Sequence, residues 1–201
     1  MAKKQLILNA FVESCSGHQS PGLWAHPDDQ STNFNDVKHW VKLAQLLEAA
    51  NFHGIFIADV LVRPVSCPYP SLLSSSPQVT NSLQSFQGAY DVYKGPRNPD
   101  PAIVSGAQWP VNEPLAVVSA MAAATESLGF GVTVATTYEQ PYHLARRLST
   151  VDHLSGGRVG WNVVTGYLDS AARNLGHTEQ PPHDERYAIA EEYIEVMYKL
   201  W

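Results

Sequence analysis

The chain has few of the features that identify several protein classes. Its two cysteines, Cys15 and Cys67, form neither a metal-binding nor a disulfide pattern. It has no long basic run and a net charge of −6, so nothing indicates a nucleic-acid or anionic-membrane partner. No stretch approaches the ~20 apolar residues of a membrane span, and the apolar run after Met1–Gln5 is too short for a signal peptide. We therefore expect a cytoplasmic protein without nucleic-acid or membrane partners.

One segment is almost free of charge. From Val62 to Gln87 the only charged residue is Arg63, and prolines and serines interrupt the segment throughout. It has no helical or strand period and few residues to bury. Its composition therefore predicts a disordered insertion at 62–87.

The rest of the chain alternates between apolar runs and amphipathic segments. It is 44% hydrophobic and 16% charged, as expected of a globular protein. Glycine-bounded apolar runs predict strands, and apolar residues at helical spacing predict helices. The expected strands are Leu6–Phe11, Gly54–Ala58, Phe130–Ala135 and Arg158–Val164, and the expected helices start at Asn35-Asp36 and cover Glu113–Leu128, Pro141–Leu154 and Asp184–Leu200. This alternation predicts a parallel sheet of βαβ units.

Polar residues occur where the expected strands end. In parallel α/β folds ligands bind at the carboxyl ends of the strands. The polar residues assigned to these ends are Asn9, Asp59, Thr136, Thr137, Asn162 and Thr165. Asn162 lies within an apolar run, and from that run alone a satisfied core amide and a ligand contact are about equally supported.

Several segments of the chain match a known family in their order. They are Phe56–Asp59, Pro110–Pro114, Ala135–Tyr138, Asp152–Arg158, Trp161–Thr165 and His183–Tyr187. Together these segments resemble the luciferase-like flavin monooxygenases, in the branch of the nitrilotriacetate, pristinamycin IIA synthase and dibenzothiophene-sulfone enzymes. Near the start, Asn9–Phe11, Cys15, Gly17-His18 and Gly22–Trp24 resemble the long-chain alkane monooxygenases within that branch.

The resemblance implies a TIM (β/α)8 barrel of the bacterial-luciferase type, with residues 1–201 as its N-terminal half of about four βα units. It also implies the oxygenase component of a two-component system. A separate NAD(P)H:flavin reductase would supply reduced FMN, and O2 would form a C4a-(hydro)peroxyflavin that oxygenates a small organic substrate. The full-length protein is expected to be a homo-oligomer. A dry barrel mouth with a few polar groups suits such reactive chemistry.

The resemblance also implies roles for individual residues. The expected FMN contacts are Asp59, Thr137, Asn162, His183 and Tyr187. On the substrate side the matching positions are Cys15, His18, Tyr90 and Gln108, of which Cys15 and His18 are catalytic candidates. The third catalytic candidate, Tyr167, stands where the alkane enzymes have a histidine. A phenol with a pKa near ~10 is a poor base at neutral pH, so alkane oxidation itself is not predicted.

Two departures from the family pattern carry further predictions. A half barrel exposes two sheet edges and an apolar interior, so the 201-residue chain alone should be poorly soluble or pair with another half, and should bind FMN weakly. Removing residues 62–87 restores the family spacing. The codon for Val62 starts with GT and the codon for Gln87 can be CAG, so the segment can have the GT and AG ends of an intron. That segment is therefore either a retained intron or a genuine surface insertion.

Other functions remain open at this point. One is a deazaflavin-dependent oxidoreductase of the wider luciferase-like superfamily, and another is a truncated, inactive remnant of a monooxygenase. A metal-dependent TIM-barrel hydrolase is disfavoured because the histidines fall in no recognisable ligand spacing, so no metal is expected. Oxygen consumption with supplied reduced FMN would separate a catalyst from a remnant.

Overall fold

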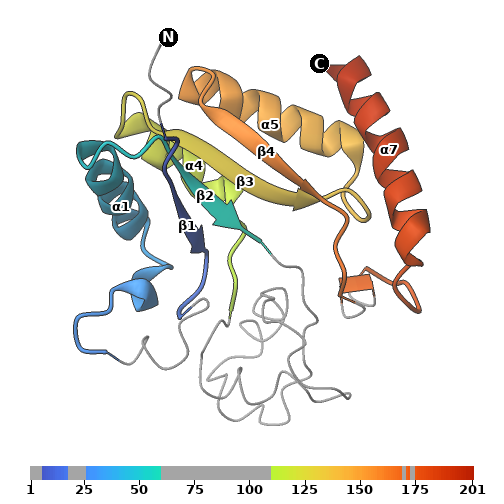
Figure 1. Ribbon diagram of the computed structural model, residues 1–201, viewed down its shortest axis with the longest axis horizontal. Helices are drawn as coiled ribbons and strands as arrows, with labels where there is room; N and C mark the ends of the chain where they lie inside the picture. Colours follow the sequence, from blue (N-terminus) through green and yellow to red (C-terminus); the bar gives the residue numbers. More distant parts are fainter. Residues whose placement is uncertain (1–5, 18–25, 60–109, 169–170, 173–174) are drawn as a thin grey trace, which may run out of the picture.

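Four parallel strands form the centre of the molecule. The computed structural model describes residues 6–17, 26–59, 110–168, 171–172 and 175–201. The strands are β1 (Asn9–Glu13), β2 (Gly54–Ala58), β3 (Gly129–Ala135) and β4 (Val159–Val164). They are adjacent in chain order, and every neighbouring pair is parallel (Figure 1). This arrangement confirms the predicted succession of βα units and is part of a TIM-type barrel wall.

Helices cover one face of this sheet. They are α1 (Val37–Ala49), α4 (Leu115–Ala123), α5 (Pro141–Ser155) and α7 (His183–Leu200), with a short 3-10 turn, η2 (Ser31–Asn33), before α1. Alternate strand residues such as Ile55, Ile57, Phe130 and Val132 form one buried cluster with side chains from all four helices. Figure 1 shows α7 beside α5, at the β4 end of the sheet.

Local signals place the helix ends largely where the sequence predicts them. The Asp36 carboxylate caps α1 by accepting a bond from the Lys38 amide at 2.9 Å, which satisfies one of the free amides of the first turn. Pro141 opens α5, and Gly156 ends it in a left-handed conformation with φ 68°, which glycine adopts without steric cost. The expected start of α1 and the expected start of α5 are thus confirmed, and α5 ends one residue later than expected.

The first strand lies later in the chain than predicted. Leu6, Ile7 and Leu8 are 81%, 75% and 49% exposed and precede β1, which begins at Asn9. The ladder starts there because Asn9 pairs with Gly54, the first residue of β2. The expected strand at Leu6–Phe11 therefore starts three residues too early. Asn9 consequently lies at the amino end of β1, so its assignment to the ligand-binding end is also wrong.

Helix α4 is shorter than the expected helix at Glu113–Leu128. It ends at Ala123, with Ala124 as its C-cap. The amides of residues 126, 127 and 128 do not continue the helix. They donate to the Glu48 carboxylate on α1, at 2.6 to 3.2 Å. A side chain distant in sequence thus satisfies the loop amides, which the local pattern around α4 does not reveal.

We expect replacement of Glu48 to lower stability in a pH-dependent way. Bonds from the Ser127, Leu128 and Glu126 backbones and the Ser127 hydroxyl hold the pKa of Glu48 below its ordinary value of 4.5. A lowered folded-state pKa adds stability above the ordinary value and loses it as pH falls through the folded one. Glu48→Gln should therefore lower the Tm at pH 7 and have progressively less effect below pH ~4.

Thermal melts of the two proteins across this pH range test the expectation. The matched control is Glu192→Gln on the exposed side of α7, which should leave the Tm unchanged. An equal Tm difference at pH 3 and pH 7 for Glu48→Gln would contradict the role of its charge.

The amino end of β4 is anchored by the side chain of Arg158. Its guanidinium donates five bonds: to the carbonyls of Ser155, Leu128, Ala122 and Thr125, and to the hydroxyl of Thr125, at 2.7 to 3.1 Å. It also lies 5.4 Å from the centre of the Phe130 ring. One side chain therefore joins the end of α4, the end of α5 and the start of β3.

Candidate functional site

The face of the sheet away from the helices carries a mixture of small, aromatic and polar side chains. Strand alternation and register place Gly131, Thr133 and Ala135 of β3 beside Gly160, Asn162 and Val164 of β4. On the first two strands Phe11 and Phe56 stack here, with ring centres 5.2 Å apart. A Cβ at Gly160 would meet nothing closer than 4.0 Å. The face therefore leaves room for a flat group above β3 and β4.

A pocket of about 470 Å³ opens at the carboxyl ends of these strands. Four residues predicted as site residues from sequence, Asp59, Tyr167, His183 and Tyr187, line it. They come from the end of β2, the segment after β4 and the first turn of α7. The size lies within the range of small-molecule sites, and its place matches the ligand-binding edge of parallel α/β folds.

Asn162 faces the interior and is tied to the wall of this pocket. Its Nδ2 donates to Thr133 Oγ1 at 3.0 Å, and Thr133 lines the pocket. Asn162 itself is half-buried. The amide thus has a protein partner, as a core polar group needs. Neither Asn162 nor Thr137 lines the pocket, and Asn162 adjoins it through its bond to Thr133.

Thr137 joins the ends of β3 and β4. Its hydroxyl donates to the Thr165 carbonyl at 2.6 Å, and the neighbouring Thr136 amide donates to the Val164 carbonyl at 2.9 Å. Thr165 lines the pocket. The Thr137 hydroxyl proton is therefore engaged in holding the rim, while its oxygen can still accept a bond from a ligand.

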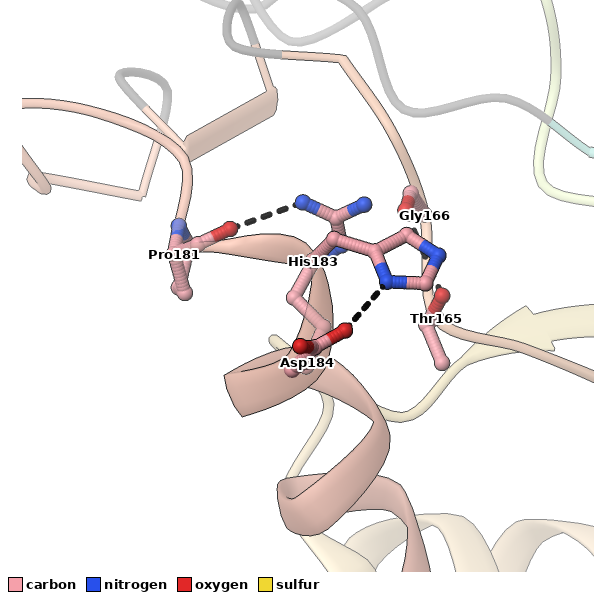
Figure 2. A network of polar contacts seen from close by, with 6 residues as sticks. Thr165, Gly166, Pro181, His183 and Asp184 are labelled. Atoms are coloured by element: carbon pink, nitrogen blue, oxygen red, sulfur yellow. Dashed lines mark hydrogen bonds and ion pairs between the residues drawn. The ribbon is translucent and has the colours of Figure 1, made fainter.

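The first turn of α7 forms the opposite wall. His183 Nδ1 lies 2.8 Å from Asp184 Oδ1, and the His183 ring centre lies 4.8 Å from that of Tyr187. Figure 2 shows His183 with the backbone of Thr165 and Gly166 nearby, and both these residues line the same pocket. His183 thus contacts a carboxylate and a ring, and both His183 and Tyr187 line the pocket.

Two further pocket residues were not predicted as site residues. Arg186 donates from Nη1 to the Pro181 carbonyl at 2.7 Å, and its Nε is buried without a partner among the described residues. Tyr138 donates its hydroxyl to Gln180 Oε1, and burial raises the pKa of its phenol. Both occur in the recognised segments, but only folding brings β3 and α7 together around one pocket.

Tyr167 is exposed at the rim, at 58% of its surface. It lines the pocket from the segment after β4, with Gly166 in a left-handed conformation (φ 68°) before it. An exposed phenol at this position can donate or accept a hydrogen bond to a ligand that enters.

Cys15 is buried, at 4% exposure, just beyond β1. Its Sγ donates to Glu13 Oε2 at 3.5 Å. Burial first, and then the charge and the hydrogen bond of Glu13, raise the pKa of the thiol well above its usual value. Because the thiolate is the nucleophilic form, this geometry favours a hydrogen-bond donor over a nucleophile.

Three predicted residues, His18, Tyr90 and Gln108, lie outside the residues that the structure describes, as does the expected insertion at 62–87. Their roles and the choice between an intron and an insertion stay predictions. In the described ranges no group of three or more acidic, histidine or cysteine side chains could hold a metal ion. No helix among those residues is long and apolar enough to cross a membrane.

A larger hollow of about 780 Å³ lies on the outer side of α4 and α5. It is shallower, and its Arg147 and Glu139 side chains pair with each other at 2.7 Å. It opens between α4 and α5, starting at the loop after β3, and Tyr138 lines both hollows. The smaller pocket is therefore the better candidate for chemistry, because the polar ends of three strands and a helix meet there.

Comparison with known proteins gives matches over nearly the whole chain. A family model described as "Luciferase-like monooxygenase" matches residues 100–201. The dimethyl-sulfide monooxygenase of Hyphomicrobium sulfonivorans is 49% identical over 199 residues, which are 99% of this chain and 36% of that protein. A crystal structure of a long-chain alkane monooxygenase superposes with a TM-score of 0.80 at 44% identity, over 99% of this chain and 39% of the other.

A third match is to a flavin-containing structure. It is a crystal structure of riboflavin lyase with modified FMN and the substrate riboflavin, with a TM-score of 0.73 and 31% identity over 98% of this chain and 38% of the other. In all three comparisons the chain spans less than two fifths of its relative's length.

Proposed function

The chain belongs to the luciferase-like monooxygenase family, and on that basis we propose that it forms the N-terminal part of a flavin-dependent monooxygenase. The reaction would transfer one atom of O2 to a small organic substrate, with reduced FMN as the electron donor. The second oxygen atom would leave as water and the flavin would leave oxidised. The observation that most supports this proposal is the single pocket lined by Asp59, Tyr167, His183 and Tyr187.

The residues around this pocket fit a flavin in their chemistry. Small residues on β3 and β4 leave space for a flat ring, and Thr137 and Asn162 border that space with polar groups. Arg186 has a buried Nε without a partner in the described ranges, which suits an anionic or carbonyl group. In this proposal the ring lies against β3 and β4, and the side chain of the cofactor extends toward His183 and Tyr187.

The chain's own side chains would bind and orient the reactants. When bound, reduced flavin supplies the two electrons that activate O2. Asp59 and Asn162 would set the position of the ring, and Tyr167 would hold the substrate or its developing polar group by a hydrogen bond. Cys15 and His18 would lie on the substrate side, where Cys15 stays a thiol bonded to Glu13. The apolar residues of the wall, such as Leu168 and Ala171, would limit water around the reacting atoms.

The partners follow from the same proposal. The family of this chain includes two-component flavin-dependent monooxygenases, and a separate NAD(P)H:flavin reductase is proposed as the source of reduced FMN. O2 and a small organic molecule are the other reactants, and the full-length protein is proposed to be a homo-oligomer. The relative that acts on dimethyl sulfide makes organic sulfides a first substrate class to assay.

Oxygen consumption is the test of this function. The protein completed with its C-terminal part would be given reduced FMN, O2 and dimethyl sulfide, a long-chain alkane or no substrate. We expect substrate-dependent formation of an oxygenated product with one of the organic substrate classes. If oxygen is consumed but no oxygenated product forms with either substrate, the result would support an inactive remnant.

A substitution at Asn162 tests the cofactor site separately from the substrate. Asn162→Asp keeps the size of the side chain, but a carboxylate cannot donate to Thr133 and adds negative charge beside this pocket-lining residue. We expect FMN affinity of the completed protein to fall about tenfold or more, equivalent to about 1.4 kcal/mol. Fluorescence titration measures this change.

The control for that substitution is Gln45→Glu, which adds the same charge on the exposed side of α1. It should leave FMN affinity unchanged. Equal affinities of the Asn162→Asp and wild-type proteins would return Asn162 to a purely structural role in its bond to Thr133.

A further inference from the structure

Glu13 is a buried acid that the proposed flavin chemistry does not use. It is 5% exposed, whereas glutamate is seldom buried so completely. It ends β1, pairs in register with Ala58 of β2, and alternates with Val12, which packs on the helix side. Its carboxylate therefore lies on the interior face, close to the edge where the pocket opens.

The contact of Glu13 with Cys15 gives this acid a specific target. Cys15 follows the end of β1 by two residues, in a bend, and its Sγ donates to Glu13 Oε2 at 3.5 Å. Among the described residues Glu13 is the ionisable group that raises the pKa of this thiol, in addition to burial. Asp59, the other acid at this edge, follows Ala58 and carries the same sign of charge, so it cannot favour a thiolate.

We propose that Glu13 is a positioning residue that keeps Cys15 in its thiol form and thereby protects it from oxidation by hydrogen peroxide released at the flavin pocket. The source of the peroxide rests on the proposed function. Reduced flavin and O2 give oxidised flavin and hydrogen peroxide whenever no substrate accepts the oxygen. A cysteine at the same end of the barrel would meet this peroxide repeatedly.

The protective effect follows from the chemistry of the sulfur. A thiolate attacks one oxygen of the peroxide, an S–O bond forms and the O–O bond breaks, which gives a sulfenic acid and hydroxide. Sulfur loses two electrons and the peroxide gains them. The thiol reacts far more slowly than the thiolate. A carboxylate that holds the proton on Sγ lowers the thiolate fraction, and each unit of pKa changes that fraction tenfold.

The test is the rate of Cys15 oxidation in Glu13→Gln, with Cys67→Ala in both proteins so that one thiol remains. The full 201-residue chain is treated with hydrogen peroxide alone at several pH values, sulfenic acid is trapped with dimedone, and the adduct is measured by mass spectrometry. We expect oxidation at least about tenfold faster in Glu13→Gln at pH 8, with its pH profile moved to lower pH. Equal or slower oxidation would overturn the proposal.

Two further variants separate charge from loss of structure. Ser14→Ala removes another buried side-chain oxygen of the same segment, one that has no hydrogen-bond partner in the described ranges, and should leave the rate unchanged. Glu13→Asp keeps the charge but shortens the reach to Sγ, and should give an intermediate rate. If circular dichroism shows that Glu13→Gln is unfolded, folded Glu13→Asp replaces it, and a wild-type rate there overturns the proposal.

This experiment contains no flavin, so it can fail while the monooxygenase proposal stands. In a second arm the completed protein receives reduced FMN and O2 without substrate. Faster Cys15 oxidation in Glu13→Gln with added peroxide, but not in this arm, would support the role of Glu13 and count against the flavin pocket as the source of peroxide.

Discussion

Arg158→Lys should unfold at markedly lower urea concentration than the wild-type protein. The wild-type guanidinium donates five bonds, four of them to backbone carbonyls. An ammonium has three donors and no planar fork, so at least two acceptors lose their charged donor. Hydrogen bonds to charged groups contribute roughly 1.5–3 kcal/mol each. We therefore expect the free energy of unfolding to fall by about 3 kcal/mol, a large part of a typical ~5–15 kcal/mol.

Urea titration followed by circular dichroism measures this loss. Arg146→Lys is the matched control, because Arg146 is exposed on α5 and its substitution should change the free energy of unfolding by less than ~0.5 kcal/mol. Arg158→Met, which removes all five donors, should be less stable than Arg158→Lys. Equal midpoints for Arg158→Lys and the control would show that the acceptors find other partners.

Completing the barrel should tighten FMN binding by about a hundredfold or more. In the described part β1 and β4 each pair on one side only, and the family resemblance assigns the phosphate-binding loop to the later part of the barrel. Two charge-assisted bonds of ~1.5 kcal/mol each amount to about 3 kcal/mol, which is roughly a hundredfold in affinity. The test fuses the 201-residue chain to the corresponding C-terminal part of the dimethyl-sulfide monooxygenase relative and titrates FMN.

The C-terminal part alone is the control for that fusion, because it measures the FMN binding that does not depend on the 201-residue chain. We expect neither part by itself to match the affinity of the fusion. Sub-micromolar FMN binding by the monomeric 201-residue chain would contradict the prediction and would mean that one half of the site suffices.

The strands and helices with local boundary signals could be predicted from the sequence. Asp36, Pro141 and Gly156 act on the residues next to them, and the structure places them where those effects require. The errors arose where a distant segment decides the boundary. Leu6–Leu8 are apolar enough for a strand, but pairing with Gly54 starts β1 later. After α4, the backbone amides of residues 126–128 bond to the carboxylate of Glu48 on another helix, and they do not continue the helix.

The roles of the predicted site residues stay predictions, and the structure shows only which of them lie together. Asp59, Tyr167, His183 and Tyr187 lie in recognised segments or next to one, and the structure brings them to one pocket. Nothing local marks Thr133 as the partner of Asn162, because that contact depends on the register of β3 with β4. Glu13 likewise reads as part of a short polar run until the fold buries it.

The bonds of Arg158 and Glu48 have a practical consequence for altering this protein. Both side chains tie segments at the amino edge of the sheet, opposite the edge that carries the pocket. Libraries that randomise the pocket rim around Gly166 and Tyr167 leave the hydrogen bonds of Arg158 and Glu48 intact. We therefore expect the fold to tolerate many different rim sequences. Selection for new substrates should therefore begin at the rim, with the codons for Arg158 and Glu48 held constant.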